Sequence, residues 1–252
     1  MKITILGCGT STGVPMVGCR CQVCTSDDPR DKRTRASILM CYNGRTVLVD
    51  TSTDLREQAL RQNISRIDAV LFTHAHADHV NGIDDLRGFH FIHKEVIPCF
   101  ASRETLAILQ SGFSYIFNVH EGSGYTPLLN AHEIRDPFDM FGQTVIPVPL
   151  LHGRNMSLGY RIGNFAYLTD CSAIPDHSLG LLQGVELLIV DGLRWTEHPF
   201  HFNISGAIAA ARQIKAPRTI LTHLTHQIAY SEEIKLPHGF ELAYDGMELE
   251  LQ

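Results

Sequence analysis

Four good metal ligands lie within six residues of this chain, in the segment His74-Ala75-His76-Ala77-Asp78-His79. The segment follows an apolar run, residues 69–72, which predicts a buried strand that ends where the ligands begin. In open α/β folds, ligands and catalytic groups collect at the carboxyl ends of strands. Imidazole and carboxylate groups suit first-row divalent metals. A chain with 14 histidines will contain chance pairs, but this ordered cluster predicts a metal site at a strand end.

Three more residues of the ligand type occur later in the chain, namely His152, Asp170 and His223. Each follows an apolar segment that predicts a strand. A single histidine behind a strand is more often a core or surface residue than a ligand. Together with the first cluster, however, the three residues fit one rim of strand ends that carries two metals.

The order of these residues resembles the signature of the metallo-β-lactamase superfamily, which is His-x-His-x-Asp-His, then a single His, a bridging Asp and a final His. The resemblance covers the chain from Met1 to about its C-terminus. It implies an α/β fold, the four-layer αβ/βα sandwich, in a single domain over residues 1–252. It also implies two metal ions with these ligands: His74, His76 and His152 on one, Asp78, His79 and His223 on the other, and Asp170 bridging both.

An acid at the end of an early apolar run, Asp50, matches a further position of the superfamily. By resemblance, its carboxylate holds a ligand imidazole in orientation, since metal-bound histidines usually have a partner for the other ring nitrogen. The alternative is an aspartate that only starts a helix or a turn.

A second group of metal ligands is the loop Cys19-Arg20-Cys21-Gln22-Val23-Cys24. Three thiolates at this spacing predict a zinc site, and His226 is the natural fourth ligand because it lies three residues after His223. The alternative is three unpaired cysteines. Seven cysteines, an odd number, argue against a disulfide framework, and the other four have no such grouping: Cys8, Cys41, Cys99 and Cys171.

The glycine-rich segment Leu6–Pro15, the cysteine loop and Leu221-Thr-His-x-x-His226 are together similar to a narrower family. It is the family of the phosphoribosyl 1,2-cyclic phosphate phosphodiesterase of the carbon–phosphorus lyase pathway. The resemblance implies a structural zinc on the three cysteines and His226, and manganese beside zinc as the active-site metal. The glycines fit neither the dinucleotide fingerprint nor the P-loop, so we interpret them as a tight turn near the metals.

The chemistry expected of such a site is hydrolysis at phosphorus. Two divalent ions about 3.5–4 Å apart can share a hydroxide and clamp both ends of an in-line displacement. We therefore predict a dinuclear-metal-dependent phosphodiesterase that acts on a small cyclic or nucleotide-like diester, of the phosphoribosyl cyclic phosphate kind. Asp78 and His201 are its expected catalytic residues. By resemblance, His201 is the active-site histidine that binds no metal, and its imidazole can protonate the leaving oxygen. His198 competes for that role, and an exposed loop histidine is the alternative for either.

Other functions remain open. A thioester or lactam hydrolase of the glyoxalase II or β-lactamase type would use the same ligands, and so would a transfer-RNA 3′-processing endonuclease. A net charge of −6 and the absence of a dense Lys/Arg run disfavour nucleic acid. A non-catalytic metal-stabilised module is disfavoured because none of the seven ligands is missing. The sequence does not decide whether the active-site metals are manganese or zinc. It also leaves the oligomeric state open, with a homodimer as one alternative.

No apolar run approaches the roughly 20 residues of a membrane span, and residues 1–7 are typical of a strand rather than a signal peptide. We therefore expect no membrane partner and a cytoplasmic protein. The basic patch Arg30, Lys32, Arg33 and Arg35, diluted by acids, is interpreted as a solvated loop, with contact to a partner or a substrate phosphate as the lesser alternative.

The expected strands are 3–6, 37–42, 46–49, 69–72, 96–100, 144–149, 160–162, 165–168, 187–190 and 219–222. Hairpins are expected at Asn43-Gly44 and Gly163-Asn164, and a closing hairpin about Asp245-Gly246. Helices are expected at 55–62, 103–110 and 206–215, the last with Ser205 as N-cap. Residues 88–139 are expected to form the wall or lid of the substrate pocket. Four residues there or just before could bind a substrate phosphate or sugar, although each alone is more often a surface residue: Arg87, His90, His93 and Lys94.

Overall fold

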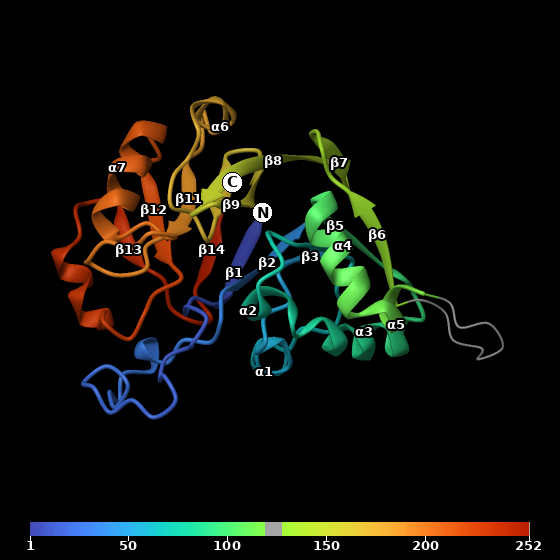
Figure 1. The fold of residues 1–252 in the computed structure, drawn as a ribbon, viewed down its shortest axis with the longest axis horizontal. Coiled ribbons are helices and arrows are strands. Elements are labelled where there is room, and N and C mark those ends of the chain that lie inside the picture. Colours follow the sequence, from blue (N-terminus) through green and yellow to red (C-terminus); the bar gives the residue numbers. More distant parts are fainter. Residues whose placement is uncertain (119–127, 252) are drawn as a thin grey trace.

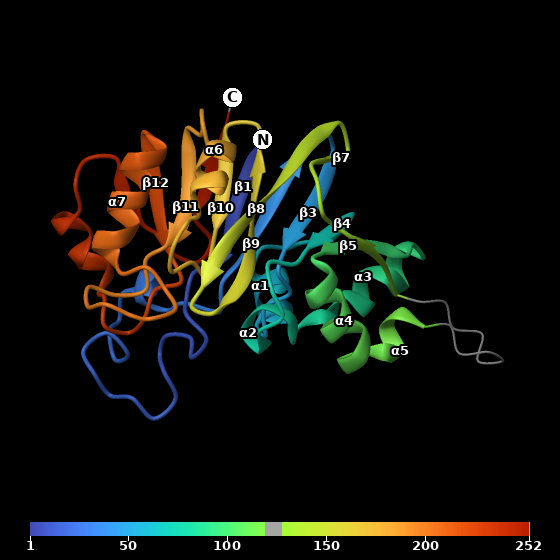
Figure 2. The ribbon, with the colours of Figure 1, turned by 45° about the horizontal axis from the view of Figure 1, so that its top comes forward.

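Two seven-stranded sheets lie face to face in the computed structural model, which describes residues 1–118 and 128–251. Figures 1 and 2 show helices on the outer side of each sheet, so the layers run helix, sheet, sheet, helix. In order across the first sheet the strands are β14 (Glu248–Glu250), β1 (Lys2–Gly7), β2 (Ser37–Tyr42), β3 (Arg45–Val49), β4 (Ala69–Leu71), β5 (Ile97–Ala101) and β6 (Leu129–Glu133). This is the four-layer αβ/βα sandwich that the sequence predicts.

The second sheet repeats the plan of the first. Its strands in order are β13 (Phe240–Leu242), β12 (Arg218–Thr222), β11 (Leu187–Asp191), β10 (Phe165–Leu168), β9 (Asn155–Ile162), β8 (Gln143–His152) and β7 (Phe138–Met140). In each sheet an antiparallel part adjoins a parallel part: β3 to β6 are parallel in the first, and β10 to β13 in the second. Parallel strands end at a common edge, and the polar residues of the site follow these ends.

The main core lies between the two sheets and comes from alternate residues of each strand. On β2, Ile38 and Met40 face the opposite sheet, whereas Leu39 packs with the outer helices. Phe165 and Tyr167 of β10 meet them from the other side. Because both faces of each sheet are covered, the strands read as nearly continuous apolar runs, which made them predictable.

Helices cover the outer faces through separate cores. Those on the first sheet are α1 (Leu55–Arg61), α2 (Ala77–Val80), α3 (Leu86–His93), α4 (Arg103–Gly112) and α5 (Ser114–Phe117). Those on the second are α6 (Asp176–Leu181) and α7 (Ile204–Ile214). Short 3-10 helices occur at Pro29–Asp31, Ile83–Asp85 and Tyr230–Lys235. Within the described ranges, no helix has the length and apolar character needed to cross a membrane.

Every predicted strand and helix overlaps an observed one, but two predictions about ends are wrong. Helix α7 starts at Ile204, and its N-cap is Asn203, whose side chain accepts a hydrogen bond from the Gly206 backbone N–H at 2.8 Å; Ser205 lies inside the helix. The turn at Gly246 exists, yet β13 and β14 belong to different sheets and form no hairpin. The Asp245 carboxylate instead accepts hydrogen bonds from the backbone N–H groups of Cys8 and Thr34. These bonds fix the segment of chain that passes from one sheet to the other.

The segment 88–139 builds one end of the first sheet, since it supplies β5, β6, α4 and α5. Residues 119–127 of this segment lie outside the described residues.

The basic patch is not simply a solvated loop, because the Arg33 side chain is fully buried. Its guanidinium pairs with Asp31 and donates to the carbonyl oxygens of Thr225 and Ile228. A buried cation needs such partners, and these come from a distant part of the chain.

Candidate metal centre

Three residues of the predicted site follow strand ends in a left-handed backbone conformation. Asp50 after β3, Asp170 after β10 and His223 after β12 have φ values of 63°, 52° and 59°. Non-glycine residues adopt this region at a cost of about 1–3 kcal/mol, and such strain concentrates at functional sites. Here the sharp turn directs each side chain into the space where the strand ends meet.

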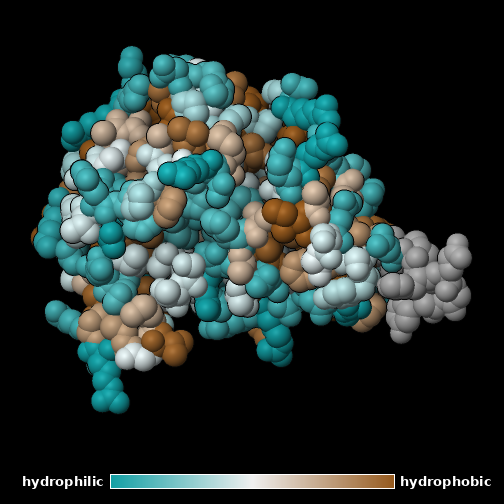
Figure 3. Space-filling model, in the orientation of Figure 1, coloured by the Kyte–Doolittle hydropathy of each residue, from teal (hydrophilic) through white to brown (hydrophobic). Residues whose placement is uncertain are grey.

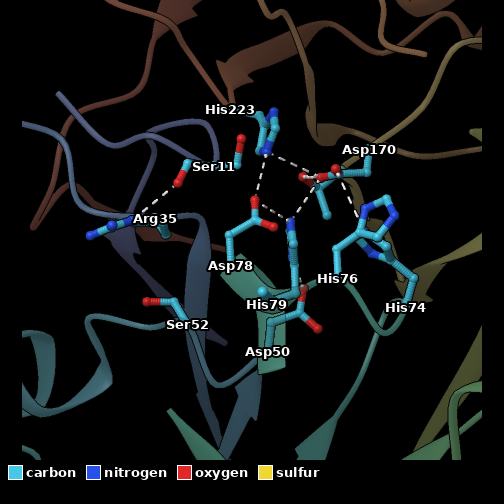
Figure 4. A network of polar contacts seen from close by, with 12 residues as sticks. Ser11, Arg35, Asp50, Ser52, His74, His76, Asp78, His79, Asp170 and His223 are labelled. Atoms are coloured by element: carbon cyan, nitrogen blue, oxygen red, sulfur yellow. Dashed lines mark hydrogen bonds and ion pairs between the residues drawn. The ribbon is translucent and has the colours of Figure 1, made fainter. Parts of the chain in front are cut away.

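Asp170 lies at the centre of this space, between two groups of histidines (Figure 4). Its Oδ2 atom is 3.7 Å from His74 Nε2 and 3.9 Å from His152 Nε2. Its Oδ1 atom is 3.1 Å from His79 Nε2 and 3.4 Å from His223 Nε2. One carboxylate therefore presents one oxygen to each group, which is the arrangement of a ligand shared by two cations.

The first group consists of His74, His76, His152 and Asp170, whose ligand atoms all lie within 4.8 Å of one another. His74 Nε2 and His76 Nδ1 are 2.9 Å apart. The Nδ1–H of His152 donates to the Phe200 carbonyl at 2.8 Å, which leaves Nε2 as the lone-pair nitrogen. Three imidazole nitrogens and a carboxylate oxygen around one point fit a tetrahedral divalent cation.

The second group consists of Asp78, His79 and His223, again within 4.8 Å. Asp78 Oδ2 is 3.5 Å from His79 Nε2 and 3.6 Å from His223 Nε2. Both Nε2 atoms are buried and have no hydrogen-bond partner. Buried polar atoms are rarely left unpaired, so these nitrogens fit the role of metal ligands.

Asp50 supports the second group from below (Figure 4). Its carboxylate accepts the Thr73 backbone N–H and hydroxyl, both at 2.8 Å, and the His79 Nδ1–H at 2.7 Å. The last contact fixes the His79 tautomer and aims Nε2 at Asp78 and Asp170. Asp50 thus makes the contact that the sequence analysis assigned to it.

The charges of this cluster shift its pKa values strongly. Burial and the His79 charge hold the pKa of His74 well below its usual range, and burial also lowers the pKa of His152. Burial opposes ionisation of Asp170, but the charges of His223 and His79 lower its pKa well below the ordinary value. Burial likewise opposes charging of His223, yet the Asp170 charge and the Asp78 contact raise its pKa to about 9. The buried Asp170 carboxylate thus stays ionised and attracts cations.

His201 lies beside the two groups and is held by an acid that the sequence analysis missed. Its Nδ1–H donates to Asp191 Oδ2 at 2.7 Å, and its ring stacks on His223 with centroids 4.8 Å apart. Asp191 is completely buried and also accepts the Cys171 backbone N–H. It ends an apolar strand just as the predicted acids follow theirs, so the same signal would have found it. His201 lines the cavity over the metal groups, whereas His198 does not.

That cavity has a volume of about 300 Å³. Besides the predicted residues it is lined by three that the sequence did not indicate: Ser11, Asn155 and Phe200. Ser11 belongs to the glycine-rich loop. A Cβ on Gly7 would lie 2.1 Å from the Arg35 carbonyl oxygen, so only glycine lets the loop pack this closely. The Ser11 carbonyl accepts from Arg35, which is paired with Asp54 at 2.7 Å.

The four residues around α3 that were proposed to bind a phosphate or sugar lie elsewhere. Arg87 pairs with Asp84 at 2.8 Å and His93 bonds to the Ser65 carbonyl at 2.7 Å. Neither these two nor His90 and Lys94 line the cavity at the metal groups.

Cys19, Cys21, Cys24 and His226 form a separate group, with ligand atoms within 4.8 Å of one another. The Sγ atoms of Cys19 and Cys21 are each 3.3 Å from His226 Nδ1. A hydrogen bond from the Cys24 backbone N–H and the contact with His226 lower the pKa of Cys21 to about 6. All seven cysteines are free. Three thiols and one imidazole around a point are the donor set of a closed zinc site.

The fold and this centre are those of a hydrolase of the metallo-β-lactamase superfamily. The family model described as "Beta-lactamase superfamily domain" matches residues 45–224, and the chain belongs to that superfamily. Within it the chain groups with the PhnP family. It is 41% identical to the protein in the solved structure of "a New Diphosphatase from the PhnP Family", with a TM-score of 0.92 over 100% of this chain and 98% of that one.

Two curated relatives carry other names. The "Octanoyltransferase" of Porphyromonas gingivalis (strain ATCC BAA-308 / W83) is 42% identical over 254 residues, which cover 98% of this chain and 51% of that protein. The chain therefore spans about half the length of that relative. The "Coenzyme PQQ synthesis protein B" of Cupriavidus necator (strain ATCC 17699 / DSM 428 / KCTC 22496 / NCIMB 10442 / H16 / Stanier 337) is 28% identical, with 99% of both chains covered. Zinc-bound PqqB from Methylobacterium extorquens, 22% identical with a TM-score of 0.78, shares the fold.

Proposed function

We propose that this chain is a metal-dependent phosphoric diester hydrolase that acts on a small diester, of the phosphoribosyl cyclic phosphate kind. The observation that carries the proposal is the Asp170 carboxylate, which turns one oxygen toward each of two groups of imidazoles. Two cations held side by side can stabilise both the attacking and the leaving oxygen of an in-line displacement at phosphorus.

The residues present fit two divalent ions, manganese or zinc. We assign His74, His76 and His152 to one, Asp78, His79 and His223 to the other, and Asp170 to both. When bound, the ions would lower the pKa of a water and neutralise charge on the phosphate. A structural zinc would occupy Cys19, Cys21, Cys24 and His226. A thiolate site of this kind persists in a reducing compartment, which supports a cytoplasmic location.

We assign to His201 the role of proton donor to the leaving oxygen. Asp191 accepts the Nδ1–H of His201, so the second proton of a charged imidazole lies on Nε2. Because His201 lines the cavity, this proton can pass to an alkoxide that leaves the phosphorus. Asp191 positions the ring.

The size of the cavity supports a small substrate. About 300 Å³ is at the lower end of ligand sites and admits a sugar phosphate rather than a folded RNA. A second candidate reaction is hydrolysis of a diphosphate, favoured by the 41% identical diphosphatase. Both reactions displace a group from a phosphorus that carries two substituents. The name octanoyltransferase belongs to a protein of which the chain matches only half, and it does not direct the proposal.

A substrate panel tests the proposal. Purified enzyme with added Mn²⁺ or Zn²⁺ is assayed with a ribose cyclic phosphate, a dinucleoside diphosphate, a glutathione thioester, a β-lactam and a precursor transfer RNA. Asp170→Ala serves as the control for contaminating hydrolases. We expect turnover of the cyclic diester, the diphosphate or both, lost in Asp170→Ala. Turnover of only the thioester, the lactam or the transfer RNA would contradict the proposal.

A further inference from the structure

A second cavity adjoins the metal cavity and shares part of its wall. It has a volume of about 650 Å³ and lies between α4 and the β8–β9 hairpin. His76, His152 and Asn155 line both cavities, so the two cavities are neighbours at the first metal group. We call this space the α4 cavity.

Large apolar side chains line the α4 cavity although nothing in the described chain covers them. Ile108 of α4 is 57% exposed and Met156 of β9 is 52% exposed, and both line it together with Leu158. Figure 3 shows an apolar patch beside α4 on this face of the molecule. Exposed apolar side chains that gather in a hollow indicate a surface that binds an apolar group.

The charged side chains of the lining do not select an anion or a cation. The acidic and basic side chains in the lining of the α4 cavity are Glu104 and Arg154, which carry opposite charges. Neither forms an ion pair with another described residue, so neither is committed elsewhere in the part of the chain that the structure covers. The net charge of these two side chains is zero, so they favour neither an anion nor a cation.

The position of His201 decides which end of a substrate enters. His201 lines the metal cavity and is absent from the lining of the α4 cavity. The leaving oxygen must approach His201, because that is where we place the proton donor. The substituent that stays on the phosphorus then points away from His201, past His76 and into the α4 cavity.

We infer that the enzyme also accepts acyclic diesters, and that the α4 cavity binds their retained substituent, an uncharged apolar group at least as large as an aryl ring. The inference rests on the proposed phosphodiesterase function. It assigns specificity to Ile108 and Met156, while the reacting centre stays with the metal ligands and His201.

Two substrates with one leaving group test it. p-Nitrophenyl methyl phosphate and p-nitrophenyl phenyl phosphate both release p-nitrophenolate and differ only in the retained group. kcat/KM is measured for both with the wild-type enzyme, Ile108→Ser and Met156→Ser. Ile234→Ser is the matched control, since Ile234 is 91% exposed and outside both cavities. The ratio between the substrates, compared across enzymes, cancels their intrinsic reactivities.

We expect Ile108→Ser and Met156→Ser each to lower kcat/KM for the phenyl diester by roughly tenfold, mainly through KM, and to leave the methyl diester within about twofold. The control should leave the ratio unchanged. An unchanged ratio in both cavity variants, with both diesters hydrolysed, would overturn the inference and leave the proposed function standing. Failure of the wild-type enzyme to hydrolyse either p-nitrophenyl diester, while it turns over the cyclic diester or the diphosphate, would overturn the inference alone; failure on all four substrates would overturn both. Metal content and melting temperature verify that each variant is folded.

Discussion

Asp191→Asn is the substitution that most specifically probes how the chain moves a proton to the leaving group. The side chain keeps its shape and an oxygen for the Cys171 N–H, but it loses the negative charge that faces His201 at 2.7 Å. A hydrogen bond to a charged group contributes about 1.5–3 kcal/mol. Because about 1.36 kcal/mol corresponds to tenfold in rate, its loss should slow proton transfer by about 10- to 150-fold.

The loss should depend on the leaving group. A ribose alkoxide needs a proton as it leaves, whereas p-nitrophenolate does not. We therefore expect kcat for an alkyl diester to fall by the full factor and kcat for a p-nitrophenyl diester to change by less than about threefold. Asp176→Asn, an exposed acid at the start of α6, is the matched control and should behave as wild type.

The same assay can refute the reasoning. Equal losses for both leaving groups, with metal content unchanged, would mean that Asp191 supports the metals or the fold rather than the proton donor. No loss for either would remove the Asp191–His201 pair from the mechanism.

Three further changes test other parts of the account. His201→Ala should slow alkyl diesters by about 10²–10⁴-fold and spare p-nitrophenyl diesters and metal content; if neither substrate slows, the role passes to His198. Cys21→Ser should remove one tightly bound zinc and lower the melting temperature more than it lowers kcat, since structural zinc contributes folding free energy; unchanged zinc and melting temperature would rule out that site. Arg33→Ala should reduce the free energy of unfolding by about 3–5 kcal/mol, because Asp31 and two carbonyls lose their buried partner. Arg30→Ala, at an exposed pair, should cost at most about 1 kcal/mol, and equal costs for the two would contradict that account.

Most of the fold was predictable because both sheets are covered on both faces. The segments 165–168 and 187–190 are unbroken apolar runs, and the acid that follows closely after each stands out, namely Asp170 and Asp191. The same contrast identified Asp50, Asp170 and His223 and would have identified Asp191.

Features that depend on distant contacts could not be predicted. The Asp245-Gly246 dipeptide indicates a turn, but only the neighbours of β13 and β14 decide that the turn joins two sheets. The buried state of Arg33 depends on carbonyls at positions 225 and 228, nearly the whole chain away. The α4 cavity likewise combines a helix and a hairpin that are far apart in the sequence.

Metal stoichiometry tests the central claim most directly. Elemental analysis of the purified protein, after saturation with Mn²⁺ or Zn²⁺ and removal of free ions, should give about three metals per chain, two around Asp170 and one at the cysteine group. Asp170→Ala removes the ligand that faces both histidine groups and should retain about one metal, with no diester hydrolysis. A wild-type value of one metal at saturation, or an Asp170→Ala variant with native metal content and native turnover, would contradict the dinuclear centre.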